Sequence, residues 1–451
     1  MTAIRRLAEF IATTGIADLP ADVVARGSLI LADCVGCMVA GSRVAEVQRL
    51  LALEAGRDEP CASVLGTPTR LAMDAAAYIN GTAGTWHDLD EGNLSTRTHA
   101  AIQIVPAALA EAEARGLPGD RLLEAIILAY EASARLWRAT DSRLAVHPHG
   151  TYGPLAAALA LAKLRNDAAS AIEAAANIAM TLGIAASRQA LNDGATVRNI
   201  YSGHSGRAGF QALDLRDAGF SGEADAAASI LGNIYGSGFD PAAATADLNS
   251  TWWIRRNYFK RYAAGRYAHG ALDLIDELAA ELGAGLAPEL VERIEIETFF
   301  LAATMGQQRV RTPFGCRFSI PMLVAQRIAH GSVPLTDDST RAFADPVVRE
   351  LADRVFVAEH ATATALYPDR QRTRMTVILC GGATHSLASD TILGESDRPF
   401  PAGVLEAKFA SLTEASWGNA AATAWRDLNR ITSIPDVGRL LGAWRAASHS
   451  R

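Results

Sequence analysis

Histidine, aspartate and arginine side chains gather at a few places along this chain of 451 residues, in combinations that suit proton movement. The first place is the segment 86–99, which reads WHDLDEGNLSTRTH and holds Asp90, Asn93 and His99. Polar segments between apolar helices are where binding residues tend to lie. A solvated loop with a helix cap at Thr98 is the alternative interpretation.

A pair of histidines, His147 and His149, flanks a proline in the segment 145–153 (AVHPHGTYG), just before an apolar helix. Backbone amides at a helix start attract anions, and a histidine can take or give a proton near neutral pH. An H-x-H pair can also bind a metal ion, but no third ligand stands nearby in the sequence. Acid–base chemistry is therefore favoured here, and we expect no metal.

Positive charge is supplied by three further segments. The glycine-rich segment 198–209 (RNIYSGHSGRAG) carries Arg198 and Tyr201, and its glycines suit close helix packing. The segment 260–273 (KRYAAGRYAHGALD) contributes cations and a histidine, namely Lys260, Arg261, Arg266 and His269. The segment 311–321 adds two more arginines. Cations beside a histidine suit a carboxylate substrate, although solvated surface arginines are the alternative.

Composition limits the class of protein. Apolar residues make up 49% of the chain and the net charge is −7, so a large interior is expected and nucleic acid is not an expected partner. We expect neither a signal peptide nor a membrane-spanning segment. The five cysteines are scattered, which suits a reducing cytoplasm, and Cys34 and Cys37 are expected to be buried packing residues.

The elements that must position these residues follow from hydrophobic periodicity. Apolar residues three and four apart predict helices over 20–39, 99–115, 118–139, 153–164 and 167–183. Alternation in the period of a strand appears only later, over 290–300, 374–379 and 385–389, with helices between at 321–330 and 345–354. Helical patterns return over 404–412, 419–428 and 437–448.

These patterns predict a mainly α protein of two domains, since 451 residues exceed one ordinary core. The large domain is expected to be all-helical and built from both chain ends, residues 1–268 and 400–451. The smaller α+β domain, residues 269–399, is expected to act as a lid.

Six motifs, taken in order, resemble the MmgE/PrpD family, which includes 2-methylcitrate dehydratase, cis-aconitate decarboxylase and iminodisuccinate epimerase. The stretches that carry this resemblance run nearly the full length: ADCVGCMVAGS (32–42), INGTAGTWHDLDEGN (79–93) followed by His99 and Pro106, His147 with GPLAAALALAKL, KRYAAGRYAHGALD (260–273), RFSIPMLVA (317–325) and PFPAGVLEAKF (399–409). The resemblance implies a helical domain with an α+β lid, a homodimer, and an active site between the domains. It also associates four residues with that site, Asp90, His99, His147 and His269.

The chain departs from the family pattern at several site positions. The acidic loop reads Asp90-Glu91-Gly92-Asn93 and lacks two acids, and the proline usual after the second histidine is Ala100. A family lysine aligns with Arg198 and a family histidine with Tyr201. Arginine stays protonated in proteins, so Arg198 can hold a carboxylate but cannot act as the general base.

The reaction expected from this set is proton removal from a carbon next to a carboxylate. Arg198 and Lys260, with Arg266 and Asn93, are the predicted substrate-binding residues. His147 and His99 are the predicted acid–base pair. The other predicted catalytic residues have lesser roles: Asp90 orients a histidine, His269 closes the site, and Tyr201 is a further candidate for proton transfer.

A cofactor-independent lyase of the dehydratase type, acting on a small di- or tricarboxylic acid, is the predicted function. No nicotinamide, flavin or iron–sulfur fingerprint appears, so no cofactor is expected. An epimerase of the iminodisuccinate type and a decarboxylase of the cis-aconitate type are the alternatives, because both share the proton-transfer chemistry. A protein that binds a carboxylate without turning it over is a further alternative, which the several histidines disfavour.

Overall fold

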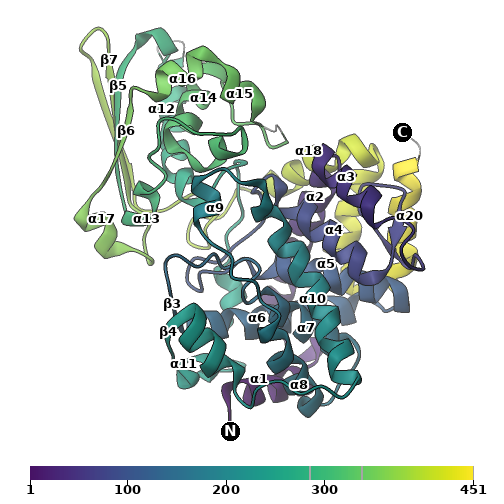
Figure 1. Cartoon of the computed structure of the whole chain (residues 1–451). Helices are drawn as coiled ribbons and strands as arrows, with labels where there is room; N and C mark the ends of the chain where they lie inside the picture. The colour runs from purple at the N-terminus through teal and green to yellow at the C-terminus, as the bar shows by residue number, and fades with distance from the viewer. Residues whose placement is uncertain (284–285, 337–338, 450–451) are drawn as a thin grey trace.

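The computed structural model describes residues 1–283, 286–336 and 339–449 (Figure 1). The protein is mainly α-helical, as predicted. Its helices before residue 260 are α1 (Ala3–Thr13), α2 (Ala21–Ser42), α3 (Ala45–Glu54), α4 (Met73–Trp86), α5 (Ala100–Arg115), α6 (Gly119–Arg138), α7 (Gly153–Leu164), α8 (Ala169–Thr181), α9 (Gln189–Asn192), α10 (Ile200–Asp217) and α11 (Pro241–Thr245).

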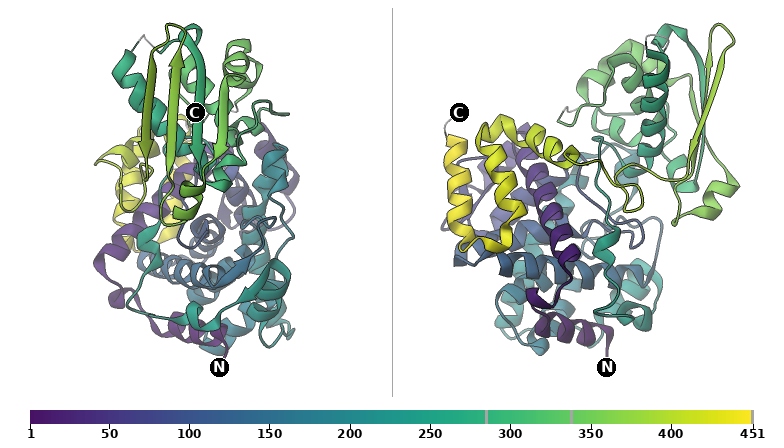
Figure 2. Two further views of the ribbon diagram at one scale, coloured as in Figure 1. Left: turned by 90° about the vertical axis from the view of Figure 1, so that its left-hand side faces the viewer. Right: turned by 180° about the vertical axis from the view of Figure 1, so that it is seen from behind.

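The later helices fall into two groups. Those interspersed with strands are α12 (His269–Leu282), α13 (Phe300–Ala303), α14 (Ile320–His330), α15 (Thr340–Ala344), α16 (Pro346–Ala352) and α17 (Ala361–Leu366). Those at the C-terminal end are α18 (Val404–Trp417), α19 (Ala420–Asn429) and α20 (Val437–His449). This last group packs against α2 and α5, so the C-terminal helices belong to the same helical part as the first helices of the chain, although the two termini lie far apart (Figure 2).

The centre of the helical part is α7, in which every residue is buried. Its sequence GPLAAALALAKL offers small apolar side chains all round, which lets neighbouring helices approach from several sides. One neighbour is α10, whose glycines make close packing possible. A β-carbon at Gly203 would lie 2.3 Å from the carbonyl oxygen of Tyr78, and one at Gly209 would lie 2.6 Å from Cβ of Ala157. The predicted role of these glycines is confirmed.

Helix α2 is long and apolar enough to cross a membrane if length and composition alone are considered. In the described structure, 78% of its most apolar window is buried inside the protein, as in the core helix of a globular domain. Cys34 and Cys37 lie on this helix and are buried, as expected.

Two short antiparallel ribbons accompany the helices of the first part. One joins β1 (Ala62–Ser63) to β2 (Arg70–Leu71), and the other joins β3 (Thr140–Ser142) to β4 (Gly236–Phe239). The expectation that residues 1–268 are all-helical is therefore wrong in detail. Strands of two to four residues carry too little alternation to be recognised in a sequence.

The main sheet has the order β6-β5-β7-β8, from Val355–Glu359, Val291–Thr298, Thr373–Leu379 and Thr384–Ser389. Three of these strands match the predicted ones. The fourth, β6, was not predicted, and it pairs in parallel with β5 after a crossover that contains α13 to α16. Strands β7 and β8 continue the sheet in antiparallel fashion. The sheet is seen face-on in the left view of Figure 2.

Hydrophobic side chains form two large clusters. The first runs from Ala3 to Phe259 and resumes with Phe409 to Trp444, whereas the second lies between Tyr262 and Val377. The proposed domain limits at 268/269 and 399/400 stay a prediction, as does the motion of a lid.

Candidate active site

The polar segment between α4 and α5 is buried, which excludes a solvated loop. Asp88, Asp90, Glu91 and Asn93 are each at most 2% exposed. Two contacts hold the backbone of this segment in place. Lys408 of α18 donates a hydrogen bond to the carbonyl oxygen of Leu89, and Gly92 forms an isolated antiparallel β-bridge with Tyr258. The C-terminal helices thus help to position the acidic residues.

The glycine at position 92 stands where the family has an acid, and the structure explains it. A β-carbon on Gly92 would lie 2.4 Å from the hydroxyl oxygen of Tyr258, so any side chain would clash. The backbone of Tyr258 in turn bonds that of Gly92, which brings Lys260 and Arg266 beside the loop.

His99 caps the start of α5 and is held by its Nδ1 atom. This nitrogen lies 3.0 Å from Oδ2 of Asp90 and 2.8 Å from the carbonyl oxygen of Glu91. Both neighbours are hydrogen-bond acceptors, so Nδ1 must carry a proton. The other nitrogen, Nε2, therefore accepts the hydrogen bond of 3.4 Å from the hydroxyl of Tyr258, and both side chains line the cavity.

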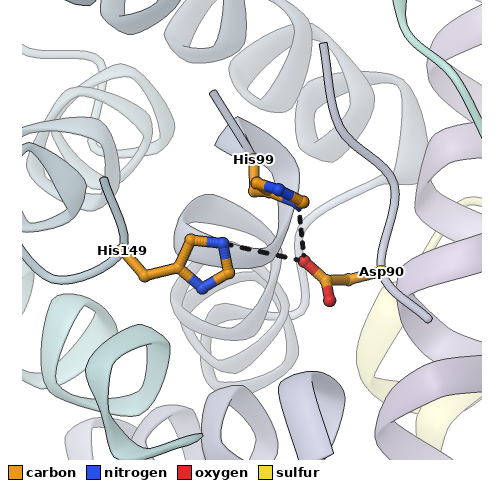
Figure 3. A group of neighbouring side chains, drawn as sticks. All are labelled: Asp90, His99 and His149. Atoms are coloured by element: carbon orange, nitrogen blue, oxygen red, sulfur yellow. Dashed lines mark ion pairs between the residues drawn. The ribbon is translucent and has the colours of Figure 1, made fainter. Parts of the chain in front are cut away.

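Asp90 is an ionised carboxylate inside the protein. Burial alone would raise its pKa, but the charge of Lys260 and the hydrogen bond from the Nδ1–H of His99 lower the pKa of Asp90 below its ordinary value. His149 approaches from the other side, with Nε2 3.9 Å from Oδ2 of Asp90 (Figure 3). The structure thus places Asp90 beside His99, and the predicted role of Asp90 in orienting a histidine stays a prediction.

His147 presents the opposite arrangement. Its Nδ1 accepts a hydrogen bond of 3.0 Å from the backbone amide of His149. Burial and the charge of Arg198 lower the pKa of His147 well below its ordinary value, so the ring is neutral. A neutral imidazole that accepts at Nδ1 carries its proton on Nε2. Two histidines of opposite tautomer therefore line one cavity.

Arg198 and Lys260, the predicted substrate anchors, are already paired in the folded chain. Arg198 Nη2 lies 2.6 Å from one oxygen of Asp88, and Lys260 Nζ lies 2.9 Å from the other. Burial alone would raise the pKa of Asp88, but the two cations lower it overall. Arg198 also donates to the carbonyl oxygen of Thr85. Asp88 therefore neutralises much of the charge that these two cations present to the cavity.

Arg266 is a buried cation with two donors to spare, whereas Arg198 has one, its Nε. Its Nη2 lies 2.6 Å from Oε1 of Glu395, and its guanidinium stacks 4.2 Å above the ring of Tyr258. Its Nε and Nη1 atoms are buried and have no hydrogen-bond partner among the residues that the structure describes. Since the side chain lines the cavity, these two donors suit an incoming carboxylate.

Three other predicted site residues are placed differently. Asn93 lines the cavity, but its amide donates to the carbonyl oxygen of Trp253. Tyr201 packs edge-on against His147, and His269 packs against Tyr262 with Nε2 near the carbonyl oxygen of Ala264. Neither Tyr201 nor His269 belongs to the cavity lining of the described chain. Their catalytic roles stay predictions.

The segment 311–321 does not contribute an anchor to the cavity. Arg317 is buried and donates to the carbonyl oxygens of His87 and Ala263, which ties this segment to the acidic loop. Arg311 is exposed and lies near Asp193.

Sequence reasoning missed Arg97, Arg188 and Tyr258, which all line the cavity. Arg97 sits within the polar segment 86–99, so that segment could have indicated it. Arg188 lies in a stretch without recognisable periodicity, and nothing in the sequence marks it.

The cavity that these residues line has a volume of about 90 Å³, which is smaller than the roughly 300–1,000 Å³ of pockets for drug-sized ligands. A larger hollow of about 1110 Å³ lies between α3, α18 and residues 312–314. Its lining includes Trp86 and Val197, but not the histidines 99 and 147. The smaller cavity therefore holds the convergent polar groups expected of an active site.

The trio Asp90, His99 and His149 brings potential metal-ligand atoms within 4.8 Å of one another (Figure 3). The sequence shows no such trio, because residue 149 and the loop are joined only by folding. Two buried histidines and a carboxylate are a ligand set that divalent metals accept. The proton on Nδ1 of His99, however, occupies the space between that ring and both neighbouring oxygens.

This arrangement suits proton transfer beside an anion: a histidine whose Nε2 has only the Tyr258 hydroxyl as partner, a histidine protonated on Nε2, and a buried guanidinium. Comparison with known proteins points to a family of enzymes. The MmgE/PrpD N-terminal domain matches residues 5–236 and the MmgE/PrpD C-terminal domain matches residues 262–432. The protein belongs to the MmgE/PrpD family, whose members are enzymes of dehydratase and decarboxylase type.

The sequence identity to the following three relatives is low. The chain is 25% identical over 366 residues to a cis-aconitate decarboxylase-like protein of Aspergillus oryzae, with 75% of each chain covered. It is 26% identical over 302 residues to a cis-aconitate decarboxylase of Aspergillus terreus, covering 62% of this chain and 59% of that relative. It is 24% identical over 380 residues to human cis-aconitate decarboxylase, covering 77% and 74%.

Proposed function

We propose that the protein is a cofactor-independent lyase of the dehydratase type, acting on a small di- or tricarboxylic acid. The observation that carries this proposal is the opposite tautomer of His99 and His147 on one cavity. His99 Nε2 is the base that removes a proton from the carbon next to a carboxylate. His147 Nε2–H is the acid that protonates the departing hydroxyl group, and the imidazolate left on His147, beside the cation of Arg198, takes back the proton that His99 has removed.

The carbanion that forms needs positive charge at its carboxylate, because electrostatic stabilisation lowers the barrier most where charge develops. Arg266 supplies it through its two unpartnered donors. Arg198 and Lys260 supply a weaker field, since Asp88 neutralises part of it. The dry surroundings strengthen each of these interactions.

Decarboxylation is the second candidate, supported by the names of the relatives. Loss of carbon dioxide leaves a carbanion that needs only a proton donor, so it gives no task to the lone pair of His99. Epimerisation uses a base and an acid on opposite faces of one carbon, and it is the third candidate. Binding without turnover does not require the histidine pair at all.

Proton NMR of candidate acids in deuterium oxide tests the proposal. A 2-hydroxy tricarboxylic acid should give a new alkene signal, with deuterium entering the carbon next to the carboxylate. Exchange without an alkene would establish an epimerase, and release of carbon dioxide from an unsaturated acid would establish a decarboxylase. Absence of any exchange over a broad panel would contradict all three. The homodimer and the cytoplasmic location stay proposals, the first open to light scattering.

A further inference from the structure

His149 lies behind the catalytic residues and does not line the cavity. Its side chain is fully buried, and its ring packs edge-on against both His99 and His147. Burial lowers the pKa of His149 well below its ordinary value, so the ring is neutral. The position of its single proton decides what it offers to Asp90.

A chain of buried polar groups leads to His149 from the helix interior. The hydroxyl of Ser205 donates to Oε1 of Gln103 over 2.7 Å, and Nε2 of Gln103 donates to Oγ of Ser202 over 2.7 Å. Oγ of Ser202 lies 3.4 Å from Nδ1 of His149. All four side chains are fully buried. The chain connects α5 and α10 to the active site.

A glycine at the start of α7 leaves room for this chain. A β-carbon on Gly153 would lie 2.0 Å from Oγ of Ser205 and 2.4 Å from Oε1 of Gln103. The backbone itself has ordinary helical conformation there, so close approach rather than backbone freedom requires the glycine.

We propose that this chain fixes the tautomer of His149 and makes it a positioning residue for the catalytic base. Ser202 accepts a hydrogen bond from the amide of Gln103 and, in this arrangement, donates its own single hydrogen to Nδ1 of His149. The proton of the neutral ring then lies on Nε2, which faces Oδ2 of Asp90. If Nδ1 of His149 instead donated to Ser202, the proton of the ring would lie on Nδ1. The lone pair on Nε2 would then face an ionised carboxylate in a dry interior, which is unfavourable.

Asp90 is consequently faced by two N–H groups: that of His99 at 3.0 Å, and that of His149 at 3.9 Å, which is too far for a hydrogen bond but directs the positive end of the N–H dipole at the carboxylate. Both favour the ionised acceptor form of the carboxylate. An ionised Asp90 keeps the proton of His99 on Nδ1, and the lone pair on Nε2 therefore faces the substrate. This role rests on the proposed function, but the tautomer of His149 can be measured without any substrate.

Long-range proton–nitrogen NMR of the full chain labelled with ¹⁵N-histidine tests the proposal. The signals of His149 are assigned by comparison with His149→Gln. The expected result is a neutral ring protonated at Nε2. Protonation at Nδ1, or a charged ring near neutral pH, would overturn the proposal. The signals of His99 and His147 in the same spectrum report on the proposed function separately, since they are expected to carry protons on Nδ1 and Nε2, respectively.

Two variants extend the test to catalysis. Ser202→Ala removes the hydroxyl that faces Nδ1, whereas Thr151→Val removes a buried hydroxyl of the same region that bonds only backbone oxygens. The Nδ1 resonance of His149 should move in the first variant and stay in the second. The kcat of Ser202→Ala should fall by roughly two- to tenfold with little change in KM, as for the loss of one ordinary hydrogen bond. Equal spectra and equal kcat in both variants would show that the chain has no positioning role.

Discussion

Oδ1 of Asp88 lies 2.6 Å from Nη2 of Arg198, so the arginine that replaces the family lysine is already paired inside the protein. Asp88 has a positive φ of 52°, which is uncommon for a residue other than glycine. Its other oxygen binds Lys260. The ion triad is a buried structural unit, and removing one partner from such a unit costs stability because a charge is left unpaired.

The contrast between Arg198 and Arg266 gives the first prediction. Arg266→Gln removes the unpartnered donors that suit the substrate carboxylate and stabilise the carbanion, so KM should rise, kcat should fall, and kcat/KM should drop by roughly ten- to a hundredfold. Arg198→Lys keeps the charge but loses the planar fork that spans Asp88 and Thr85. It should mainly lower the free energy of unfolding, measured with urea. A larger effect on KM from Arg198→Lys than from Arg266→Gln would contradict this assignment.

The second prediction concerns the acid. His147→Ala should lower turnover by at least about a hundredfold, the low end of what a positioned acid or base contributes. Circular dichroism should show an unchanged fold. His204→Ala is a matched control, because that histidine bonds a backbone oxygen outside the cavity. Turnover close to that of the native enzyme in His147→Ala would remove this residue from the mechanism.

The third prediction follows from Glu91, whose side chain accepts hydrogen bonds from Tyr130 and the amide of Ala101. Burial raises the pKa of Glu91 to about 8. The folded state therefore holds a proton that an unfolded chain releases near pH 4.5, the ordinary value. Between these limits the folded state binds more protons, so stability falls as pH rises, by at most about 1.4 kcal/mol per pH unit from this group.

Glu91→Gln imitates the protonated acid and removes that dependence. Urea denaturation at pH 5 to 8 should show a stability gain in Glu91→Gln that grows with pH. Burial also raises the pKa of Glu131, to about 7. Its effect on the free energy of unfolding is the same in the native protein and in Glu91→Gln, so it cancels in the difference. The exposed Glu289→Gln serves as control and should show no such gain. A constant difference across the pH range would mean that Glu91 is ionised throughout.

The fourth prediction is that activity survives chelation. Three potential ligand atoms meet at Asp90, but a divalent ion would have to displace the proton on Nδ1 of His99 in a region that already holds Lys260 and Arg198. Activity should be unchanged after dialysis against a chelator. Loss of turnover that one particular metal restores would show that the trio is a metal site.

Much of the fold was predictable because it depends on patterns within one segment. The helix over 153–164 and the strands near 291 and 374 each carry their own periodicity, and the structure has them within a residue or two. Strand β6 has five residues with a weak pattern, and it is defined by parallel pairing with β5, a partner about sixty residues away. Such pairing leaves no local trace in the sequence.

The site was predictable in its residue types but not in its pairings. The segments around His99 and His147 indicated proton transfer, and the structure brings both residues to one cavity. The sequence could not show that Asp88 neutralises Arg198 and Lys260, because the contacts span more than a hundred positions. It also could not show which histidine nitrogen is free, since that depends on neighbours supplied by folding.

The last prediction concerns the mouth of the cavity, where Arg97 and Arg188 are half-buried. Each donates to one backbone oxygen, that of Thr140 or Val146. Neither forms an ion pair with a carboxylate within residues 1–283, 286–336 and 339–449. Both act electrostatically on Tyr367, so they lie near each other.

Two arginines at the mouth and Arg266 inside can grip a substrate at both ends, so a second carboxylate should matter for binding. Calorimetry with propane-1,2,3-tricarboxylate and with butanoate measures this. Arg188→Gln and Arg97→Gln should each weaken binding of the tricarboxylate by roughly five- to thirtyfold, as for 1–2 kcal/mol, and leave butanoate nearly unchanged. Added salt should reduce the difference, because these charges are partly exposed. The exposed Arg311→Gln is the control. If Arg188→Gln and Arg97→Gln weaken the binding of both acids equally, the two arginines act on the fold or on the overall electrostatic potential of the cavity. They would then not hold a second carboxylate.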